Sequence, residues 1–300
     1  MVVINFIRYR FVAALLSVVL VSGAVGTYIY KMIGHGRAFE YSVDFTGGTQ
    51  VHLALDKAVD KQQLRTSLES GWPGCSIRDF ANNEVLVRVK EYSVDSEGLA
   101  SRMRDVIQTK FAGTIVTIKE LSSVSSDIGA TLRGKSLFAV LLALLLMLMY
   151  IMIRFWSFSY GFGAVVALLH DAFAMVTFCL IFNVEISAAV ISAILTVLGY
   201  SINDTIVIFS NIRDRLARPG VTDTHEAANR GINNTLRRTL LTTLTTALGV
   251  LALMVFGGHA LRDLSSVLMV GIVFGTYSSI MIASPVMLMI MGKVKSKTHK

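Results

Sequence analysis

Residues 199–214 read GYSINDTIVIFSNIRD and place one acid, Asp204, within an apolar run long enough to cross a bilayer. An ionisable side chain at membrane depth costs free energy, and such residues usually form part of a pathway, a relay or a pairing site. Asp204 is therefore a candidate functional residue on sequence alone. The plainer alternative is a helix-packing acid satisfied by Asn203, a threonine or an arginine.

The rest of the chain has the composition of a membrane protein. Its 300 residues are 53% hydrophobic and 16% charged, with a mean hydropathy of +0.61, whereas an average soluble chain is about 25% charged. A helix needs about 20 apolar residues to cross the hydrocarbon core. Such windows predict a polytopic α-helical membrane protein with six transmembrane helices, near residues 11–32, 136–153, 159–182, 186–209, 239–257 and 265–291.

One long polar insertion separates the first two predicted spans and defines the domain organisation. The chain divides into a cytoplasmic segment with the first span (1–33), an exported domain (34–132), spans two to six (133–292) and a basic tail (293–300). The N-terminus also resembles a signal peptide, with Arg8 and Arg10 before an apolar run. Because that run continues through Tyr30, we expect an uncleaved anchor.

The net charge of +8 reports topology rather than nucleic-acid binding. The 211–237 loop is rich in arginine, whereas the loop at 183–187 has no lysine or arginine. This asymmetry fits the positive-inside rule with both termini in the cytoplasm. We therefore expect residues 34–132 outside the cytoplasm and no nucleic-acid partner.

The insertion has the pattern of a small α+β domain. Two extended stretches around Gly47 and Gly48 precede a helix, two strands, an amphipathic helix and a last strand. The order β, α, β, β, α, β predicts a ferredoxin-like fold. The paired glycines predict a bend and a β-bulge, with positive φ and close backbone approach. Cys75 and Cys179 fall in different compartments, so we expect no disulfide, and no metal-ligand spacing is present.

Small and polar residues recur at helical spacing on four of the spans. Such stripes let helices pack closely in lipid, so we expect spans three to six to form a bundle and span two to face lipid. The stripes are Gly163, Ala167, His170, Ala174 and Thr177; Ser192, Thr196, Gly199 and Asn203; Arg238, Thr242, Thr245 and Gly249; and Gly271, Gly275, Ser278 and Ser279.

A polar layer in this bundle could handle protons. At 1.5 Å per residue Asp204 lies about 27 Å along its helix, and Asp171 lies near the midplane. Asn203, Arg238 and Thr242 fall at similar depth to Asp204. An aspartate beside a mobile arginine can take up and release a proton as their separation changes. Arg238 as a simple cytoplasmic anchor, and His170 with Asp171 as a structural pair, remain open alternatives.

Five motifs in order carry a family resemblance: VDFTGGT (43–49), LLHDA (168–172), GYSINDTIVIFSNIRD (199–214), LRRTLLTT (236–243) and FGTYSSI (274–280). Together they closely resemble SecF, the smaller membrane subunit of the SecD/SecF protein-export family, which is related to the RND transporters. The likeness covers nearly the whole chain. One departure is the doubled Arg237 and Arg238, of which Arg238 directly precedes TLLT as in the family pattern.

The resemblance implies a bacterial inner-membrane protein that promotes preprotein translocation with the proton-motive force. It implies SecD and the SecYEG channel as partners, YajC as a further candidate, translocating preproteins and membrane lipid as contacts, and no cofactor. It places the family's proton-path aspartate on Asp204, its gating arginine on Arg238 and the associated threonine on Thr242. Its periplasmic signature falls on Asp44, Phe45, Thr46, Gly47 and Gly48.

Two other classes of function fit the span pattern. A half-size RND-type exporter of small molecules or lipids would need a partner chain, and a membrane scaffold would tolerate loss of the buried acid. An enzyme is not expected, because the chain has no phosphate-binding loop, nucleophile elbow or HExxH motif.

Overall fold

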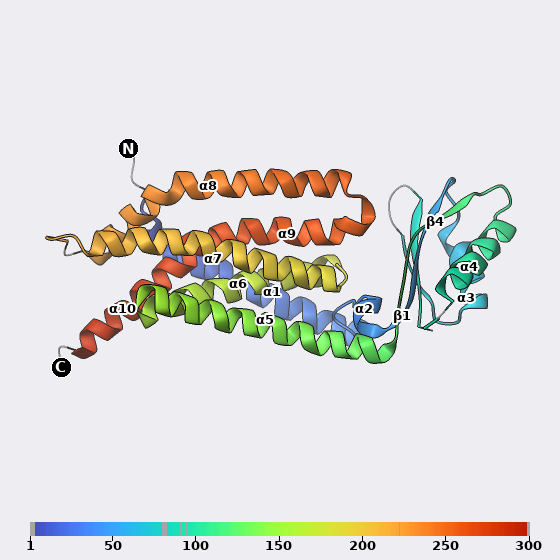
Figure 1. The fold of residues 1–300 in the computed structure, drawn as a ribbon, viewed down its shortest axis with the longest axis horizontal. Coiled ribbons are helices and arrows are strands. Elements are labelled where there is room, and N and C mark those ends of the chain that lie inside the picture. The colour runs from blue at the N-terminus through green and yellow to red at the C-terminus, as the bar shows by residue number, and fades with distance from the viewer. Residues whose placement is uncertain (1–3, 80–82, 91, 94, 222, 299–300) are drawn as a thin grey trace. The chain divides into compact units, whose positions relative to one another are not determined.

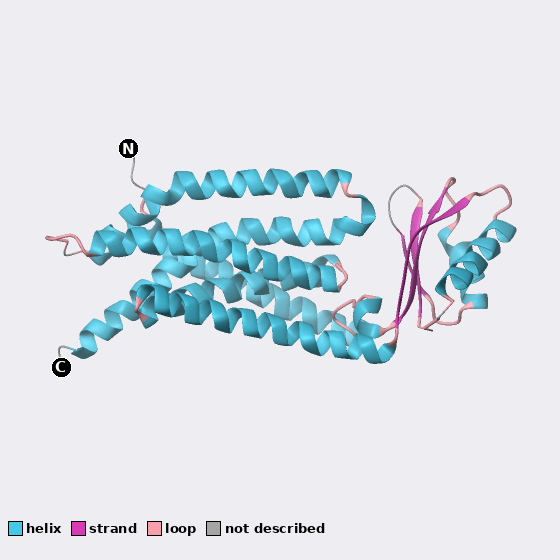
Figure 2. Ribbon diagram, viewed as in Figure 1, coloured by secondary structure: helices cyan, strands magenta, loops and turns pink. Residues whose placement is uncertain are grey.

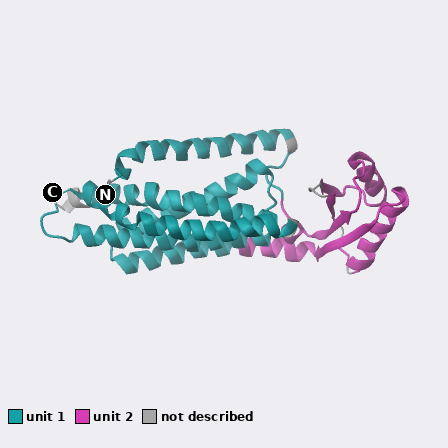
Figure 3. Ribbon diagram, turned by 90° about the horizontal axis from the view of Figure 1, so that it is seen from above, with its two compact units in different colours: residues 1–40, 138–300 teal, residues 41–137 magenta. Residues whose placement is uncertain are grey.

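The computed structural model describes residues 4–79, 83–90, 92–93, 95–221 and 223–298. They form two compact units, residues 1–40 with 138–300 (unit 1) and residues 41–137 (unit 2), coloured in Figure 3. Figure 2 shows that unit 1 is helical and that the strands lie in unit 2. Each unit is described by itself below.

Six helical segments are long and apolar enough to cross a membrane, which confirms the six predicted spans. Two of them begin well before their apolar windows, at Ser126 and Thr224. The helical elements are η1 (Phe6–Tyr9), α1 (Arg10–His35), α5 (Ser126–Phe155), α6 (Phe158–Phe182), α7 (Ala188–Leu216), α8 (Thr224–Phe256), α9 (Gly258–Ser278), π-helix η2 (Ser279–Ala283) and α10 (Ser284–Thr298), shown in Figure 1.

The interior of unit 1 is formed mainly by α6, α7 and the α9–η2–α10 span. The long α5 is largely exposed, as predicted for the second span. The prediction that spans three to six form a bundle is confirmed, although α8 is as exposed as α5 along its apolar window. It packs through one face on α7 and α9.

Two of the four predicted packing stripes are confirmed. The α6 stripe packs inward, and Gly271, Gly275, Ser278 and Ser279 are all buried on the last span. An added Cβ at Gly163 would lie 2.7 Å from the Ala283 carbonyl oxygen. Close approach of these helices therefore requires glycine.

The stripes predicted on α7 and α8 are wrong by one residue. Ser192, Thr196, Gly199 and Asn203 are exposed, and the buried face of α7 instead carries Ala193, Val197, Ser201, Asp204 and Thr205. On α8 the predicted Arg238, Thr245 and Gly249 are exposed, whereas Thr239 and Val250 are buried. One residue turns the face by about 100°, so both stripes point away from the interior of this chain.

The last span is interrupted by the π-helix η2, which the sequence analysis did not predict. Pro285 follows just after it and has no backbone N–H to donate to the preceding turn. Widening the helix by one residue accommodates this loss, and such π-bulges often occur at functional sites. The π-turn begins at Ser279, which is fully buried.

Unit 2 is a four-stranded antiparallel sheet with two longer helices. The strands are β1 (Gly48–Leu55), β2 (Ser76–Asp79), β3 (Glu84–Val89) and β4 (Val116–Val124), in the spatial order β2-β3-β1-β4. Helices α3 (Lys61–Gly71) and α4 (Ser96–Lys110) bury their predicted apolar faces against it, and the core includes Val51, Leu53, Leu64, Leu68, Met103 and Ile107.

The stretch before β1 corrects the prediction of extended structure. Residues Val43–Thr46 form a short helix, α2, because the Ser42 hydroxyl accepts a hydrogen bond from the Asp44 amide and caps it. Gly47 and Gly48 have φ of 72° and 110°, which confirms the predicted positive φ. The only register shift between β1 and β4 in the described residues lies at His52/Leu53, not at the glycines.

Close backbone approach at the glycines is confirmed. A Cβ at Gly47 would lie 2.6 Å from the Ser126 Cα, and one at Gly48 would lie 2.4 Å from the Val89 carbonyl oxygen. Gly129 faces the same turn, since its Cβ would lie 2.9 Å from the Gly47 nitrogen. The glycines of this signature thus allow the first turn of α5 to lie close to the backbone at the start of β1.

Candidate functional site

A fully buried carboxylate lies where α6, α7 and α9 meet. Asp171 on α6 has no exposed surface, and its Oδ2 accepts a hydrogen bond of 2.7 Å from the Ser201 hydroxyl on α7. Gly275 on α9 leaves room for both groups, because an added Cβ would lie 3.2 Å from the Ser201 Oγ and 3.7 Å from the Asp171 Oδ2. The three helices therefore enclose this acid through small residues.

The second oxygen of Asp171 faces a histidine. His170 Nδ1 lies 3.7 Å from Asp171 Oδ1, and neither atom has a hydrogen-bond partner within the described chain. The imidazole lies beside the rings of Phe274 and Tyr277, at centroid distances of 6.1 and 6.0 Å. The predicted neighbours His170 and Asp171 thus lie side by side, beyond hydrogen-bond distance of each other.

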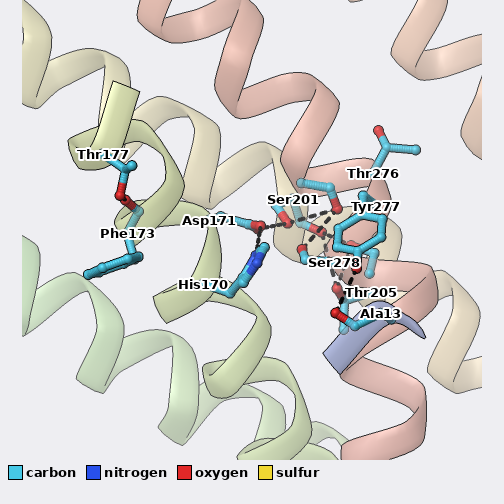
Figure 4. Close-up of polar contacts among 12 residues, drawn as sticks. Ala13, His170, Asp171, Phe173, Thr177, Ser201, Thr205, Thr276, Tyr277 and Ser278 are labelled. Carbon is cyan, nitrogen blue, oxygen red and sulfur yellow. Dashed lines mark hydrogen bonds and ion pairs between the residues drawn. The ribbon is translucent and has the colours of Figure 1, made fainter. Parts of the chain in front are cut away.

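A group of hydroxyls lies between this pair and the π-helix, as Figure 4 shows, and the backbone carbonyl of Ser201 links its members. Thr205 and Ser279 share a hydrogen bond of 2.9 Å, and the Ser279 hydroxyl also lies 3.3 Å from the Ser201 carbonyl oxygen. Ser278 donates to the Gly275 carbonyl at 3.1 Å. The widened turn of η2 therefore contributes to the same polar layer as Asp171.

Asp204 lies three residues after Ser201, on the same buried face of α7. Its exposed fraction is 4%. The charge of Arg238 on α8 acts on it electrostatically, but no ion pair within 4.0 Å joins the two among the described residues. The predicted acid and arginine therefore do not form an ion pair within the described chain.

The remaining predicted members of the layer do not gather around Asp204. Asn203 is exposed on a face of α7 turned by about 100° from that of Asp204, because it is the adjacent residue of the helix. Thr242 is half-buried and donates to the Thr239 carbonyl of its own helix at 2.9 Å. A single compact cluster of acid, amide, arginine and threonine is therefore not what this chain builds alone.

Several functional candidates escaped the sequence analysis. Thr243 and Thr276 share a hydrogen bond of 2.7 Å between α8 and α9, and Thr246 donates to the Tyr200 hydroxyl of α7 at 3.1 Å. Thr239 is buried, and its hydroxyl has no partner within the described chain. The threonine-rich run from Thr239 to Thr246 could have indicated these contacts. The threonines that make them each follow a residue of the predicted stripe by one position.

No group of three or more histidine, cysteine, aspartate or glutamate side chains could hold a metal ion in the described part of the chain. Cys75 and Cys179 are both free and buried. The groups that the site offers in the described residues are buried carboxylates and hydroxyls at a helix interface.

Comparison with known proteins identifies the family. The family model for the protein export membrane protein SecD/SecF, C-terminal, matches residues 105–293. The SecF subunit of Gemmatimonas aurantiaca is 35% identical, over 96% of this chain and 87% of the relative. That of Pseudomonas aeruginosa is also 35% identical, over 95% and 90%.

The chain also resembles one part of a longer protein, the SecDF subunit of Thermus thermophilus. The sequences are 36% identical over 92% of this chain but only 37% of SecDF. A crystal structure of SecDF, a translocon-associated membrane protein, matches at a TM-score of 0.84 and 33% identity, over 96% of this chain and 39% of that one. SecDF in a super-membrane-facing form matches at 0.70 and 31%, over 100% and 40%.

The chain therefore spans about two fifths of SecDF and most of the length of the separate SecF subunits. Six membrane-spanning helices, five motifs in order and these relatives agree with one another. The chain belongs to the SecF family of protein translocase subunits, multi-pass membrane components of Sec protein export.

Proposed function

We propose that this chain works with SecD, and through it with the SecYEG channel, to couple the proton-motive force to late steps of preprotein translocation. The observation that carries the proposal is Asp204, a buried membrane acid under the electrostatic influence of Arg238. Moving one charge across the membrane is worth about 2.3 kcal/mol per 100 mV, enough to bias a two-state rearrangement.

In this proposal Asp204 carries the proton, Arg238 gates it and Thr242 lies beside the path. Arg238 cannot release its own proton in practice, so its role is to favour or disfavour the charged form of Asp204. The pair His170–Asp171, with Ser201, would form a branch or extension of the path. Asn203, which is exposed, would face the partner rather than the acid.

Partnership with SecD is supported by two exposed polar stripes inside the spans. Ser192, Thr196, Gly199 and Asn203 on α7, and Arg238, Thr245 and Gly249 on α8, have exposed surfaces in the chain alone. Helix interfaces within bilayers are enriched in such residues, and an arginine exposed to lipid is costly. A second membrane subunit packed on these stripes would use the small residues as a helix interface and would cover the arginine. Relatives named SecDF join the two names in one protein. YajC is a further candidate partner.

The proposed location is the bacterial inner membrane, with both termini in the cytoplasm. The arginines at the end of α7 and in the first part of α8, and the basic tail, would then lie inside, in keeping with the positive-inside rule. Unit 2 would be a periplasmic domain of ferredoxin-like fold, for which its β-α-β-β-α-β order and its sheet order are the support. Its role would be to contact emerging preprotein rather than to catalyse a covalent reaction.

The test is Asp204→Asn in cells whose only SecF is this chain. Asp214→Asn is the matched control, since it removes a carboxylate from the same helix at an exposed position. We expect both variants to insert and to co-purify with SecD. Export of a reporter preprotein should fall to the level of cells lacking SecF for Asp204→Asn and stay normal for Asp214→Asn. Unchanged export in the Asp204→Asn cells would contradict the proton role.

A further inference from the structure

Two cavities of unit 1 adjoin each other, since they share part of their lining. The larger, of about 670 Å³, is lined mainly by polar and charged side chains of η1, α1 and the start of α8. The smaller, of about 300 Å³, lies between the start of α1 and α10. Four residues line both cavities: Ile7, Arg10, Phe11 and His225.

The larger cavity is lined by three arginines and two carboxylates, so its lining carries a small excess of positive charge. Arg230 pairs with Glu226 at 2.5 Å, and the Asp223 carboxylate accepts hydrogen bonds from the His225 and Glu226 amides. By contrast, no carboxylate within the described chain pairs with Arg8 or Arg10. Two guanidinium groups are thus left to bind an anion, and arginine suits a phosphate because it presents parallel donors.

The wall that holds these arginines is fixed before any ligand binds. Asn229 accepts a hydrogen bond from the Ile7 amide at 3.0 Å and donates to the Asn5 side chain at 2.8 Å. Asn233 bonds both the amide and the carbonyl of Ile4, at 2.9 and 2.7 Å. These contacts tie the segment before α1 to α8, so little ordering is needed on binding.

The smaller cavity is lined mainly by apolar side chains, apart from Arg10 and His225. It is lined by Pro285, Leu288 and Met289 of the last span, together with Phe11. Phe11 is 73% exposed and Met289 is 59% exposed. An anionic group in the first cavity would therefore hold a hydrocarbon chain against the second.

We propose that the joined cavities bind one anionic phospholipid, with its phosphate at Arg8 and Arg10 and an acyl chain against Phe11, Leu288 and Met289. A free phosphate would fill only the polar part and leave the apolar part unused. A zwitterionic lipid of equal chain length would use the apolar part without matching the charge. The site would anchor the start of the first span and the start of α8 to the membrane surface.

Native mass spectrometry of the full-length chain in a non-ionic detergent tests this proposal. The chain is mixed separately with dioleoyl phosphatidylglycerol, with dioleoyl phosphatidylcholine, and with phosphatidylglycerol plus millimolar inorganic phosphate. The variants are Arg8→Gln, Arg8→Gln with Arg10→Gln, and Arg218→Gln, which removes a charge at the same end of the unit but lines neither cavity. Melting temperatures identify any variant that fails to fold, and Arg8→Gln alone changes only an exposed side chain.

We expect phosphatidylglycerol to be retained in preference to phosphatidylcholine. Each arginine removed should weaken its retention about fivefold, whereas Arg218→Gln should not. Met289→Ser should weaken it about threefold relative to Met254→Ser, an exposed methionine of α8 outside both cavities. Equal retention of the two lipids, or equal behaviour of the arginine variants and Arg218→Gln, would overturn the proposal. So would displacement of the lipid by inorganic phosphate, which would indicate a site for a free anion.

Discussion

Asp171 is a fully buried acid on a membrane-spanning helix. Its carboxylate is enclosed by three helices, and one oxygen is satisfied by Ser201 while the other faces His170 without a hydrogen bond. A buried carboxylate with a single hydroxyl donor is costly to leave unpaired. Loss of the Ser201 hydroxyl should therefore lower the free energy of unfolding.

Ser201→Ala should lower the free energy of unfolding of the purified chain by about 1–3 kcal/mol, because it leaves the Asp171 carboxylate buried without its hydroxyl partner. Ser192→Ala is the control on the same helix. Its hydroxyl is exposed and donates only to the Ala188 carbonyl of its own turn, so the change should stay within about 0.5 kcal/mol. Thermal unfolding in detergent measures both, and equal losses would show that the Ser201 bond contributes nothing of its own.

Cys75 offers a test at one residue of unit 2. The thiol is buried, and burial raises its pKa above the ordinary value of 9.0. A thiol with a raised pKa in the folded state favours folding below its unfolded pKa and loses that contribution as pH rises through the folded pKa. In a Cys179→Ala background, maleimide labelling at pH 7.5 should be more than about tenfold slower for the folded than the unfolded chain.

Stability measured by denaturant should fall as the pH rises above about 9, and Cys75→Ala should remove that part of the fall. Rapid labelling of the folded chain at neutral pH would contradict the burial of this thiol.

Sequence could identify the acids but not their surroundings. Asp171 and Asp204 stand out because carboxylates are rare at membrane depth. Which hydroxyls meet them depends on how three helices cross, and Ser201, Thr205 and Ser279 resemble many other small polar residues in these spans. The exposure of Asn203 and Arg238 was likewise beyond prediction, because it depends on the rotation of α7 and α8.

Among the elements, the helices divide by how well their faces could be predicted. The stripes of α6 and α9 consist mainly of glycine and small residues that pack on other helices of the same chain. The helical spacing of these residues was therefore enough to predict which face is buried. On α7 and α8, two adjacent faces of each helix carry small residues. The face predicted to be buried is the one that is exposed in this chain. The π-helix could not be foreseen from Pro285 alone, since prolines in spans also produce kinks.

Two glycine substitutions test the difference between the buried stripe of α6 and the exposed stripe of α8. Gly163→Ala should destabilise the purified chain by about 1–3 kcal/mol, because its Cβ would lie 2.7 Å from the Ala283 carbonyl oxygen and 2.9 Å from the Met287 Cβ. Gly249→Ala has no atom within 4 Å of its Cβ and should be neutral or stabilising by up to about 1 kcal/mol, since alanine favours the helix. Melting temperatures measured side by side decide, and destabilisation by Gly249→Ala would indicate that α8 packs more closely than described.

For the molecule as a whole, the two exposed stripes on α7 and α8 suggest an incomplete assembly. A helical membrane protein with an exposed arginine and exposed small residues on its spans has a surface suited to another helix rather than to lipid alone. The family comparison fits this view, because the chain matches about two fifths of SecDF. The one-residue displacement between the predicted and the buried faces is then explained, since each helix would use one face within the chain and the next for the partner.

Gly199→Leu tests this view of the whole molecule. Gly199 is exposed on α7 and has no atom within 4 Å of an added Cβ, so the isolated chain should keep its melting temperature within the error of the measurement. A partner helix packed on this stripe would collide with the leucine side chain. We therefore expect the amount of SecD that co-purifies with the variant to fall at least about fivefold, because overpacking at a close helix contact costs about 1–3 kcal/mol.

Gly26→Leu is the matched control, because Gly26 is an exposed glycine of α1 that likewise has no neighbour within 4 Å. The same substitution there adds the same apolar volume to a span without touching the α7 stripe, so SecD should co-purify in normal amount. If Gly199→Leu retains SecD as well as Gly26→Leu does, the α7 stripe faces lipid. The polar residues along it would then serve only their own helix, as the bonds of Ser192 and Thr196 to the carbonyls four residues before them already do.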